Sequence, residues 1–187
     1  MKPYVLVIGH ACAAGEAPAN TLAGVRACLD AAAEAMEIDV QLCADSVPVL
    51  MHDDTVDRTT NLSGPVREKT LAELQAADAG DGEPVPTLDQ VLALVEGRLS
   101  VLCELKATPG SPEQDQLCVD EVVAVIRRHN AEAWTAIHSF NPDMVERARR
   151  TEPRISAAII SPPVADEAAD RLLGALLKRN GQAVSVH

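Results

Sequence analysis

Short aliphatic segments alternate regularly with segments of helical periodicity through all 187 residues, and this alternation limits the chain to a few fold classes. Apolar residues repeated every three or four positions predict amphipathic helices, and short continuous Val/Ile/Leu-rich runs predict buried strands. Six runs are predicted as parallel strands: 4–9, 36–42, 99–105, 133–140, 155–160 and 183–187. Repeated strand–helix units of this kind are typical of α/β proteins with a mainly parallel sheet.

Helix start signals recur between these strands. They include side chains that cap a helix N-terminus, two capping-box sequences, and prolines at first helical positions. The helices predicted from these signals and from apolar periodicity cover 20–34 and 166–178 and begin at Thr70, Thr87, Ser111 and Asn141.

The number of parallel strands is small for a closed barrel. An eight-stranded (β/α) barrel takes about 250 residues and rarely fewer than about 200. Six parallel strands therefore leave about two of eight units missing. Strand edges left open in this way can pair with another chain. We expect a single domain over 1–187 that could form a homo-oligomer through its open sheet edges.

Segment 47–52 reads as an additional strand, joined to strand 36–42 by a connection too short for a parallel crossover. The two must therefore form an antiparallel hairpin. If its loop is the two residues at 45 and 46, Asp39 lies opposite His52, and Glu37 lies opposite Asp54. A loop longer or shorter by one residue would turn His52 away.

Carboxylates lie on one face near the ends of two strands. Glu37 and Asp39 are two residues apart, as are Glu104 and Lys106, so period-two alternation places each pair on a common face. Each pair alone is better explained by a solvated strand end. Together, three carboxylates without a thiol or clustered imidazoles suit a hard cation such as Mg²⁺ or Ca²⁺ better than zinc.

Two histidines follow strand ends in the same manner. His10 follows the first strand, and His52 ends the hairpin. A lone histidine at a strand end is more often structural or simply exposed. Two imidazoles beside a bound cation would suit proton transfer near neutral pH.

Composition excludes several classes of function. The chain has 16 Lys+Arg against 28 Asp+Glu, a formal net charge of −12, and an aromatic content of 2%. It therefore lacks the basic surface and the stacking residues expected of a nucleic-acid-binding protein. The aliphatic run at 5–8 is far too short to span a membrane. The five cysteines never have C-x-x-C spacing, which favours reduced thiols and a cytoplasmic location.

The chain resembles the glycerophosphodiester phosphodiesterase family. The matching segments are 9–10, 17–22, 37–42, 47–55, 57–61, 86–89, 104–106 and 139–140. The block from 37 to 61 is the most specific of them. The resemblance implies a TIM-barrel-type (β/α) fold that hydrolyses a small-molecule glycerophosphodiester to glycerol 3-phosphate and an alcohol.

The resemblance also implies a role for each candidate residue. One divalent cation, Mg²⁺ or Ca²⁺, would be held by three carboxylates: Glu37, Asp39 and Glu104. His10 and His52 would be the general acid and base, and Lys106 would help to hold the phosphate.

Three departures from the family pattern leave a second interpretation open. Ala11 and Cys12 stand where the family has Arg-Gly, and Ala19 stands where it has Glu. The missing arginine would have offered a fork of donors to a phosphate oxygen, a role for which Arg58 could substitute. The family also continues for two further strand–helix units. The alternative is a degenerate, weak or inactive member that acts as a metal- and phosphate-binding or self-associating module.

Overall fold

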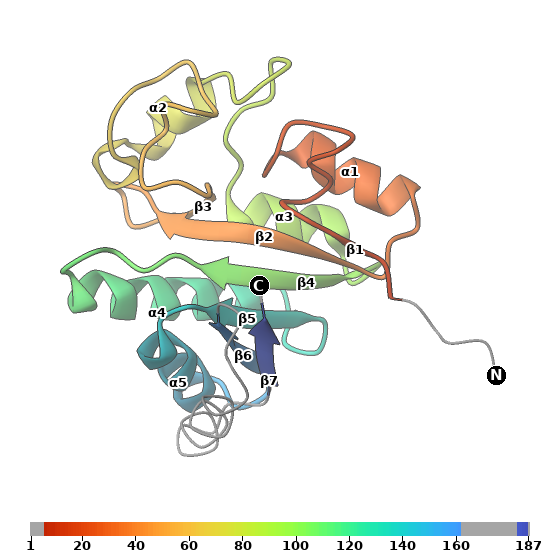
Figure 1. Cartoon of the computed structure of the whole chain (residues 1–187), viewed down its shortest axis with the longest axis vertical. Coiled ribbons are helices and arrows are strands. Elements are labelled where there is room, and N and C mark those ends of the chain that lie inside the picture. Colours follow the sequence, from red (N-terminus) through yellow and green to blue (C-terminus); the bar gives the residue numbers. More distant parts are fainter. Residues whose placement is uncertain (1–5, 162–182, 187) are drawn as a thin grey trace.

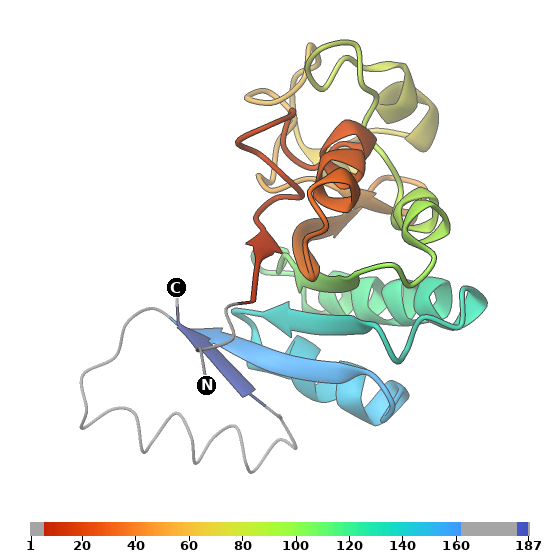
Figure 2. The ribbon, with the colours of Figure 1, turned by 90° about the vertical axis from the view of Figure 1, so that its right-hand side faces the viewer.

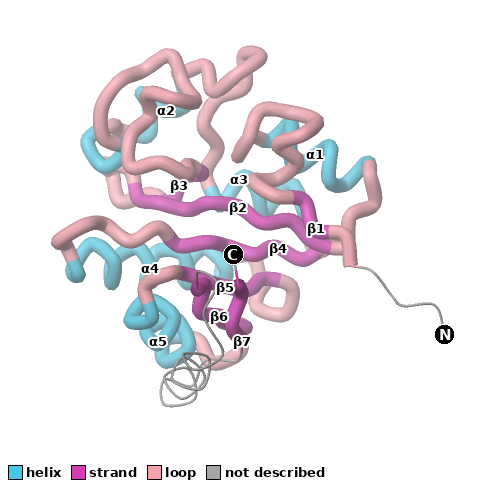
Figure 3. Tube along the Cα trace, in the orientation of Figure 1, coloured by secondary structure: helices cyan, strands magenta, loops and turns pink. Residues whose placement is uncertain are grey.

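The sheet is built on strand β2 (Ala35–Leu42), which pairs on both of its edges. The computed structural model describes residues 6–161 and 183–186. Within them the sheet order is β1-β2-β4-β5-β6-β7, all parallel, and β3 pairs antiparallel with β2 (Figures 1 and 3). The other strands are β1 (Ile8–Gly9), β3 (Pro48–Leu50), β4 (Ser100–Leu105), β5 (Thr135–Ser139), β6 (Ser156–Ser161) and β7 (Ala183–Val186). Six parallel strands confirm the predicted fold class, and β1 and β7 form the two ends of a sheet that is not closed in the described residues.

The principal helices follow one another around the outside of the curved sheet (Figure 2). In this order α1 (Leu22–Asp30), α3 (Leu88–Val95), α4 (Pro112–Arg128) and α5 (Pro142–Thr151) each contact the next. A short α2 (Leu71–Ala76) and a 3₁₀ turn (Val66–Glu68) lie in the long segment after β3. No helix in the described part of the chain is long and apolar enough to cross a membrane. The predicted helix over 166–178 lies outside the described residues.

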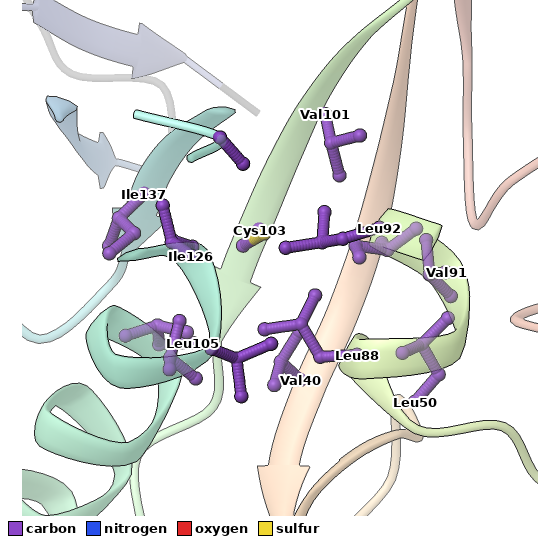
Figure 4. Close-up of a cluster of buried hydrophobic side chains, with 14 of the residues drawn as sticks. Val40, Leu50, Leu88, Val91, Leu92, Val101, Cys103, Leu105, Ile126 and Ile137 are labelled. Carbon is purple, nitrogen blue, oxygen red and sulfur yellow. The ribbon is translucent and has the colours of Figure 1, made fainter. Parts of the chain in front are cut away.

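Period-two alternation divides each central strand between two environments. On β2, Met36, Ile38 and Val40 are fully buried in the main apolar core. On β4, Val101 and Leu105 enter the same core, which also receives side chains from α3 and α4 (Figure 4). The opposite face of both strands carries the acids, because residues two apart along a strand share a side.

The helix start signals are confirmed at most positions. Thr70 and Thr87 form complete capping boxes at α2 and α3. Pro112 and Pro142 are at the first positions of α4 and α5. Helix α1 differs from the prediction, because its N-cap is Thr21, whose hydroxyl accepts from the Gly24 amide.

Asn20, predicted as that cap, adopts a left-handed conformation with φ +57°. Its side chain bonds Asp39 instead. Helix α1 therefore begins one residue later and leaves Asn20 free to bind the end of β2.

The hairpin exists as predicted, but its predicted register is wrong by one residue. Val40 pairs with Leu50, and the Met51 amide donates to the Asp39 carbonyl at 3.0 Å. Asp39 thus lies opposite Met51, not His52. The loop has three residues, and its last, Ser46, has φ +58°. A three-residue hairpin loop that ends in the left-handed region is a common alternative to the two-residue turn.

The predicted contact between Glu37 and Asp54 is also absent from the hairpin. Strand β3 ends at Leu50, and the Asp54 carbonyl accepts from the Val66 amide at 3.0 Å. The segment beyond β3 folds over its own small apolar core, formed with residues of β3 and the hairpin: Cys43, Val49, Met51, Val56, Val66, Leu74, Ala79 and Val85. All five cysteines are buried free thiols, in agreement with the predicted reduced state.

Candidate active site

Three buried carboxylates meet on the inner face of the sheet. Glu37, Asp39 and Glu104 are 8%, 1% and 5% exposed. Asp39 and Glu104 are register partners across the β2–β4 pairing, and Glu37 precedes Asp39 by two residues on the same face. Parallel pairing thus brings together the three residues that the sequence singled out as metal ligands. Buried carboxylates are costly unless a cation or donor offsets their charge.

Lys106 provides one such positive charge. Its ammonium donates to Asp39 Oδ1 at 2.8 Å and also bonds Glu104 Oε1. Burial alone would lower the pKa of Lys106, but the bonds to the two carboxylates outweigh it and hold that pKa above its usual value. The predicted phosphate-binding residue is therefore charged and lies within the acidic cluster.

Asp39 is held on its other side by Asn20. The Asn20 amide nitrogen donates to Asp39 Oδ2 at 2.7 Å, and the Asp39 backbone amide donates to Asn20 Oδ1 at 3.1 Å. Both oxygens of Asp39 therefore have donors, one from Lys106 and one from Asn20. Asn20 was not among the predicted site residues.

Glu37 is less completely satisfied. Its Oε2 accepts from the Ala11 amide at 2.9 Å, whereas its buried Oε1 has no hydrogen-bond partner among the described residues. Burial, and then the nearby charge of Asp39, raise the pKa of Glu37 to about 7. A buried carboxylate oxygen without a donor, next to two other acids, fits a position where a divalent cation would bind.

A fourth inward-facing group, the imidazole of His138, joins this cluster. Ligand atoms of Glu37, Glu104 and His138 all lie within 4.8 Å of one another. His138 is the register partner of Glu104 across the β4–β5 pairing, and it is 9% exposed. The sequence analysis missed it, although its place near the end of a predicted strand was a usable signal.

The two predicted catalytic histidines line one cavity beside Asp39. Ala11, Ala19 and Arg58 are among the other residues that line it. The side chain of His10 is 72% exposed, and its Nε2 lies 3.9 Å from Glu37 Oε2. Despite the shifted hairpin register, the chain beyond β3 still brings His52 to this cavity.

Neighbouring groups hold His52 in place. Its Nδ1 lies 2.7 Å from Asp53 Oδ1, and Arg58 bonds both oxygens of Asp53 at 2.6 and 3.0 Å. The hydrogen bonds from Arg58 and then from His52 lower the pKa of Asp53 to about 2. The Gln41 side-chain amide donates to the carbonyls of Met51 and Asp53, which flank His52. The backbone and the ring of His52 are therefore both fixed.

The fold and site together define a TIM-barrel-type protein with its polar groups at the carboxyl ends of parallel strands, where such folds carry their active sites. The chain belongs to the glycerophosphodiester phosphodiesterase family: the sequence model of the glycerophosphoryl diester phosphodiesterase family matches residues 10–186.

Individual relatives agree with this assignment. The Bacillus subtilis protein YhdW is 38% identical over 164 residues, which cover 84% of this chain and 66% of that protein. A glycerophosphodiester phosphodiesterase of Caldanaerobacter subterraneus is 32% identical over 167 residues, 83% of this chain and 66% of that protein. The chain thus spans just under two thirds of the length of these two relatives.

A solved structure supports the fold. An Oleispira antarctica phosphodiesterase, in complex with the product sn-glycerol-3-phosphate, superposes with a TM-score of 0.86 at 27% identity. The match covers 98% of this chain and 75% of that one.

Proposed function

We propose that this chain is a divalent-metal-dependent phosphodiesterase that hydrolyses glycerophosphodiesters to glycerol 3-phosphate and an alcohol. The observation that carries the proposal is the meeting of three buried carboxylates, Glu37, Asp39 and Glu104, with a cavity lined by His10 and His52. The family membership and the product held by the Oleispira relative support the same substrate class.

In this proposal Glu37, Asp39 and Glu104 hold one divalent cation. When bound, the cation supplies positive charge that offsets the charge of the phosphoryl oxygens. Lys106, which already bonds two of these carboxylates, lies where its ammonium can also meet a phosphate oxygen. Fixed positive groups at the phosphate stabilise charge that develops during the reaction.

In this proposal His10 and His52 transfer the protons of the reaction. The hydrogen bond from His52 Nδ1 to Asp53 leaves Nε2 as the nitrogen that exchanges a proton with the substrate. One imidazole accepts the proton of the attacking hydroxyl, and the other donates a proton to the leaving alkoxide. His10 is the second member of this pair, since it lines the same cavity.

The experiment is a product assay on the purified chain with a panel of glycerophosphodiesters that differ in their alcohol. We expect glycerol 3-phosphate to be released, and release to stop with chelator and in Glu37→Ala or His52→Ala. His129→Gln is a matched control, because His129 pairs with Asp89 away from this site. Phosphate-ester cleavage that is indifferent to both chelator and these variants would refute the proposal.

One observation favours a second candidate function, that of a binding module with weak or no turnover. Ala11 and Ala19 line the cavity at positions where the family has Arg and Glu. Arg58 also lines it, but its guanidinium is already bonded to Asp53. This candidate predicts a thermal shift on addition of a divalent cation and no product; rapid turnover would exclude it.

Self-association through the sheet edge is a further part of that alternative. Leu6, Val7 and Ile8, at the β1 end of the sheet, are 51%, 55% and 44% exposed. A second copy that paired along this edge would cover them. Light scattering on the purified chain tests this, and a monodisperse monomer contradicts it. The buried free thiols support a reducing, cytoplasmic location as part of the proposal.

A further inference from the structure

We infer that the imidazole of His138 is a ligand of the divalent cation, so that the site binds ions that accept nitrogen as well as oxygen donors. The inference rests on the proposed metal-dependent function and goes beyond it. It adds a residue that neither the motif pattern nor the carboxylate spacing indicates, and it changes the expected choice of ion.

The backbone fixes the position of His138. Strand β5 pairs with β4 so that His138 lies directly beside Glu104, which in turn lies directly beside Asp39. Register partners in a parallel sheet project to the same side. His138 therefore shares the inner face with the acids and is 9% exposed there.

The distances suit a common ion. Ligand atoms of Glu37, Glu104 and His138 lie within 4.8 Å of one another. Three atoms spaced evenly around one ion, with bonds of roughly 2.2 Å, are about 3.8 Å apart. Ligand atoms within 4.8 Å of one another therefore need a closure of about 1 Å at most, which side-chain rotation can supply, to hold a cation between them.

Both carboxylate oxygens of Asp39, which is outside this trio, already accept a hydrogen bond. One bonds Lys106 and the other bonds Asn20. Glu37 Oε1, by contrast, is buried and has no hydrogen-bond partner in the described part of the chain. The oxygen available to a cation therefore belongs to Glu37, which is in the same trio as His138.

An imidazole ligand changes the expected ion. Sites made only of oxygen atoms suit Ca²⁺ and Mg²⁺, whereas imidazole suits first-row transition ions. Mn²⁺ is the member of that row that also accepts the carboxylate oxygens of this site. We therefore expect the chain to bind Mn²⁺ more tightly than Ca²⁺. His138→Gln should weaken Mn²⁺ binding by about tenfold or more, since even supporting groups of a metal site contribute 10- to 100-fold.

The test is pulsed electron paramagnetic resonance of Mn²⁺ added to the full chain. Mn²⁺ coordinated by histidine shows a ¹⁴N coupling, and Mn²⁺ held only by oxygen does not. We expect the coupling in the wild type and in His129→Gln, and its loss in His138→Gln. Bound Mn²⁺ without the coupling, or a coupling that survives His138→Gln, overturns the inference and leaves the metal-dependent function intact.

A second variant keeps the inference testable if His138→Gln does not fold. In the quadruple variant His10→Gln/His52→Gln/His129→Gln/His187→Gln the coupling should persist, because His138 is then the one histidine left in the sequence. Loss of the coupling from the folded, Mn²⁺-binding quadruple variant would assign it to another histidine and overturn the inference. Absence of any Mn²⁺ binding by the wild type would overturn the proposed metal dependence itself, and this inference with it.

Discussion

Asp39 and Glu104 are neighbours across the parallel pairing of β2 and β4, and the ammonium of Lys106 bonds both of their carboxylates. Within the described residues the Lys106 ammonium thus links the two acids, and the side chain of Lys106 is 15% exposed. Removal of one member of a buried ion group leaves uncompensated charge. We therefore expect this contact to set the stability of the acidic cluster and its response to an added divalent ion.

Lys106→Met should lower the free energy of unfolding of the metal-free protein by about 3 kcal/mol, since two buried acids lose their counter-charge. A divalent cation should restore part of that stability by binding the native state. Denaturant unfolding with chelator and with Mn²⁺ measures both effects. Lys69→Met is the control, as Lys69 lies outside the acidic cluster. An unchanged unfolding midpoint in Lys106→Met would contradict this interpretation.

The raised pKa of Glu37 predicts a pH dependence of stability. Burial first, and the charge of Asp39 second, raise its pKa from 4.5 to about 7 in the folded protein. The native state therefore keeps a proton that the unfolded chain releases, so this contribution is complete below pH 4.5 and is lost as pH rises through 7. In chelator, Glu37→Gln should gain stability relative to the wild type across this window.

Unfolding free energies at a series of pH values measure that difference. Glu113→Gln, at the exposed start of α4, is the matched control and should follow the wild type. A Glu37→Gln difference that stays constant over the window would show that Glu37 titrates normally.

Asp53→Asn tests the orientation of His52. The substitution weakens the hydrogen bond at Nδ1 and releases Arg58. We expect kcat to fall by about 10²-fold, as for loss of general acid–base catalysis, with little change in KM. Stability should change by no more than about 1 kcal/mol, because the pair is partly exposed.

The control for this variant is Asp89→Asn, which breaks another His–Asp–Arg cluster, formed with Arg128 and His129. Its kcat should match the wild type. Equal losses in the two variants would point to a general structural effect and not to an effect on His52.

Ala11→Arg tests whether the missing guanidinium limits the rate. Ala11 lines the cavity, and only its backbone amide bonds Glu37, so that bond survives the substitution. A restored donor at the phosphate should raise kcat/KM on the order of 10²-fold. Ala14→Arg places the same charge at another position of this cavity and should give a smaller gain. No difference between the two variants would show that position 11 has no special role.

The succession of strands and helices along the chain, and the common face of Glu37 and Asp39, could be predicted from sequence because both depend on short-range periodicity. Alternation alone places Glu37 and Asp39 on one face, and parallel pairing then adds Glu104. The capping boxes at Thr70 and Thr87 likewise depend only on residues three positions apart.

The hairpin register could not be predicted because it depends on a contact distant in sequence. Asp45 accepts a hydrogen bond from the Leu71 amide at 2.6 Å, and the Ala44 amide donates to the Lys69 carbonyl at 2.8 Å. These bonds tie the three-residue loop to the start of α2. The sequence of the loop alone does not reveal them, and a change of one loop residue moves His52 relative to Asp39.

The positions of Asn20 and His138 depend on contacts distant in sequence. The sequence predicts Asn20 as a helix cap, a role that Thr21 fills, and the bond from Asn20 to Asp39 spans 19 residues. No local pattern around His138 indicates a place beside the acids. Only the β4–β5 register places it beside Glu104.

One titration of the metal-free chain with Mn²⁺, in the presence of a glycerophosphodiester, measures ion binding and product formation together and so tests metal-dependent hydrolysis directly. We predict that one ion binds per chain and that release of glycerol 3-phosphate rises and saturates over the same concentration range. In Glu104→Gln both curves should shift together to higher concentration. Full product release before any ion is added, or ion binding that Glu104→Gln leaves unchanged, would contradict metal-dependent hydrolysis at the three carboxylates.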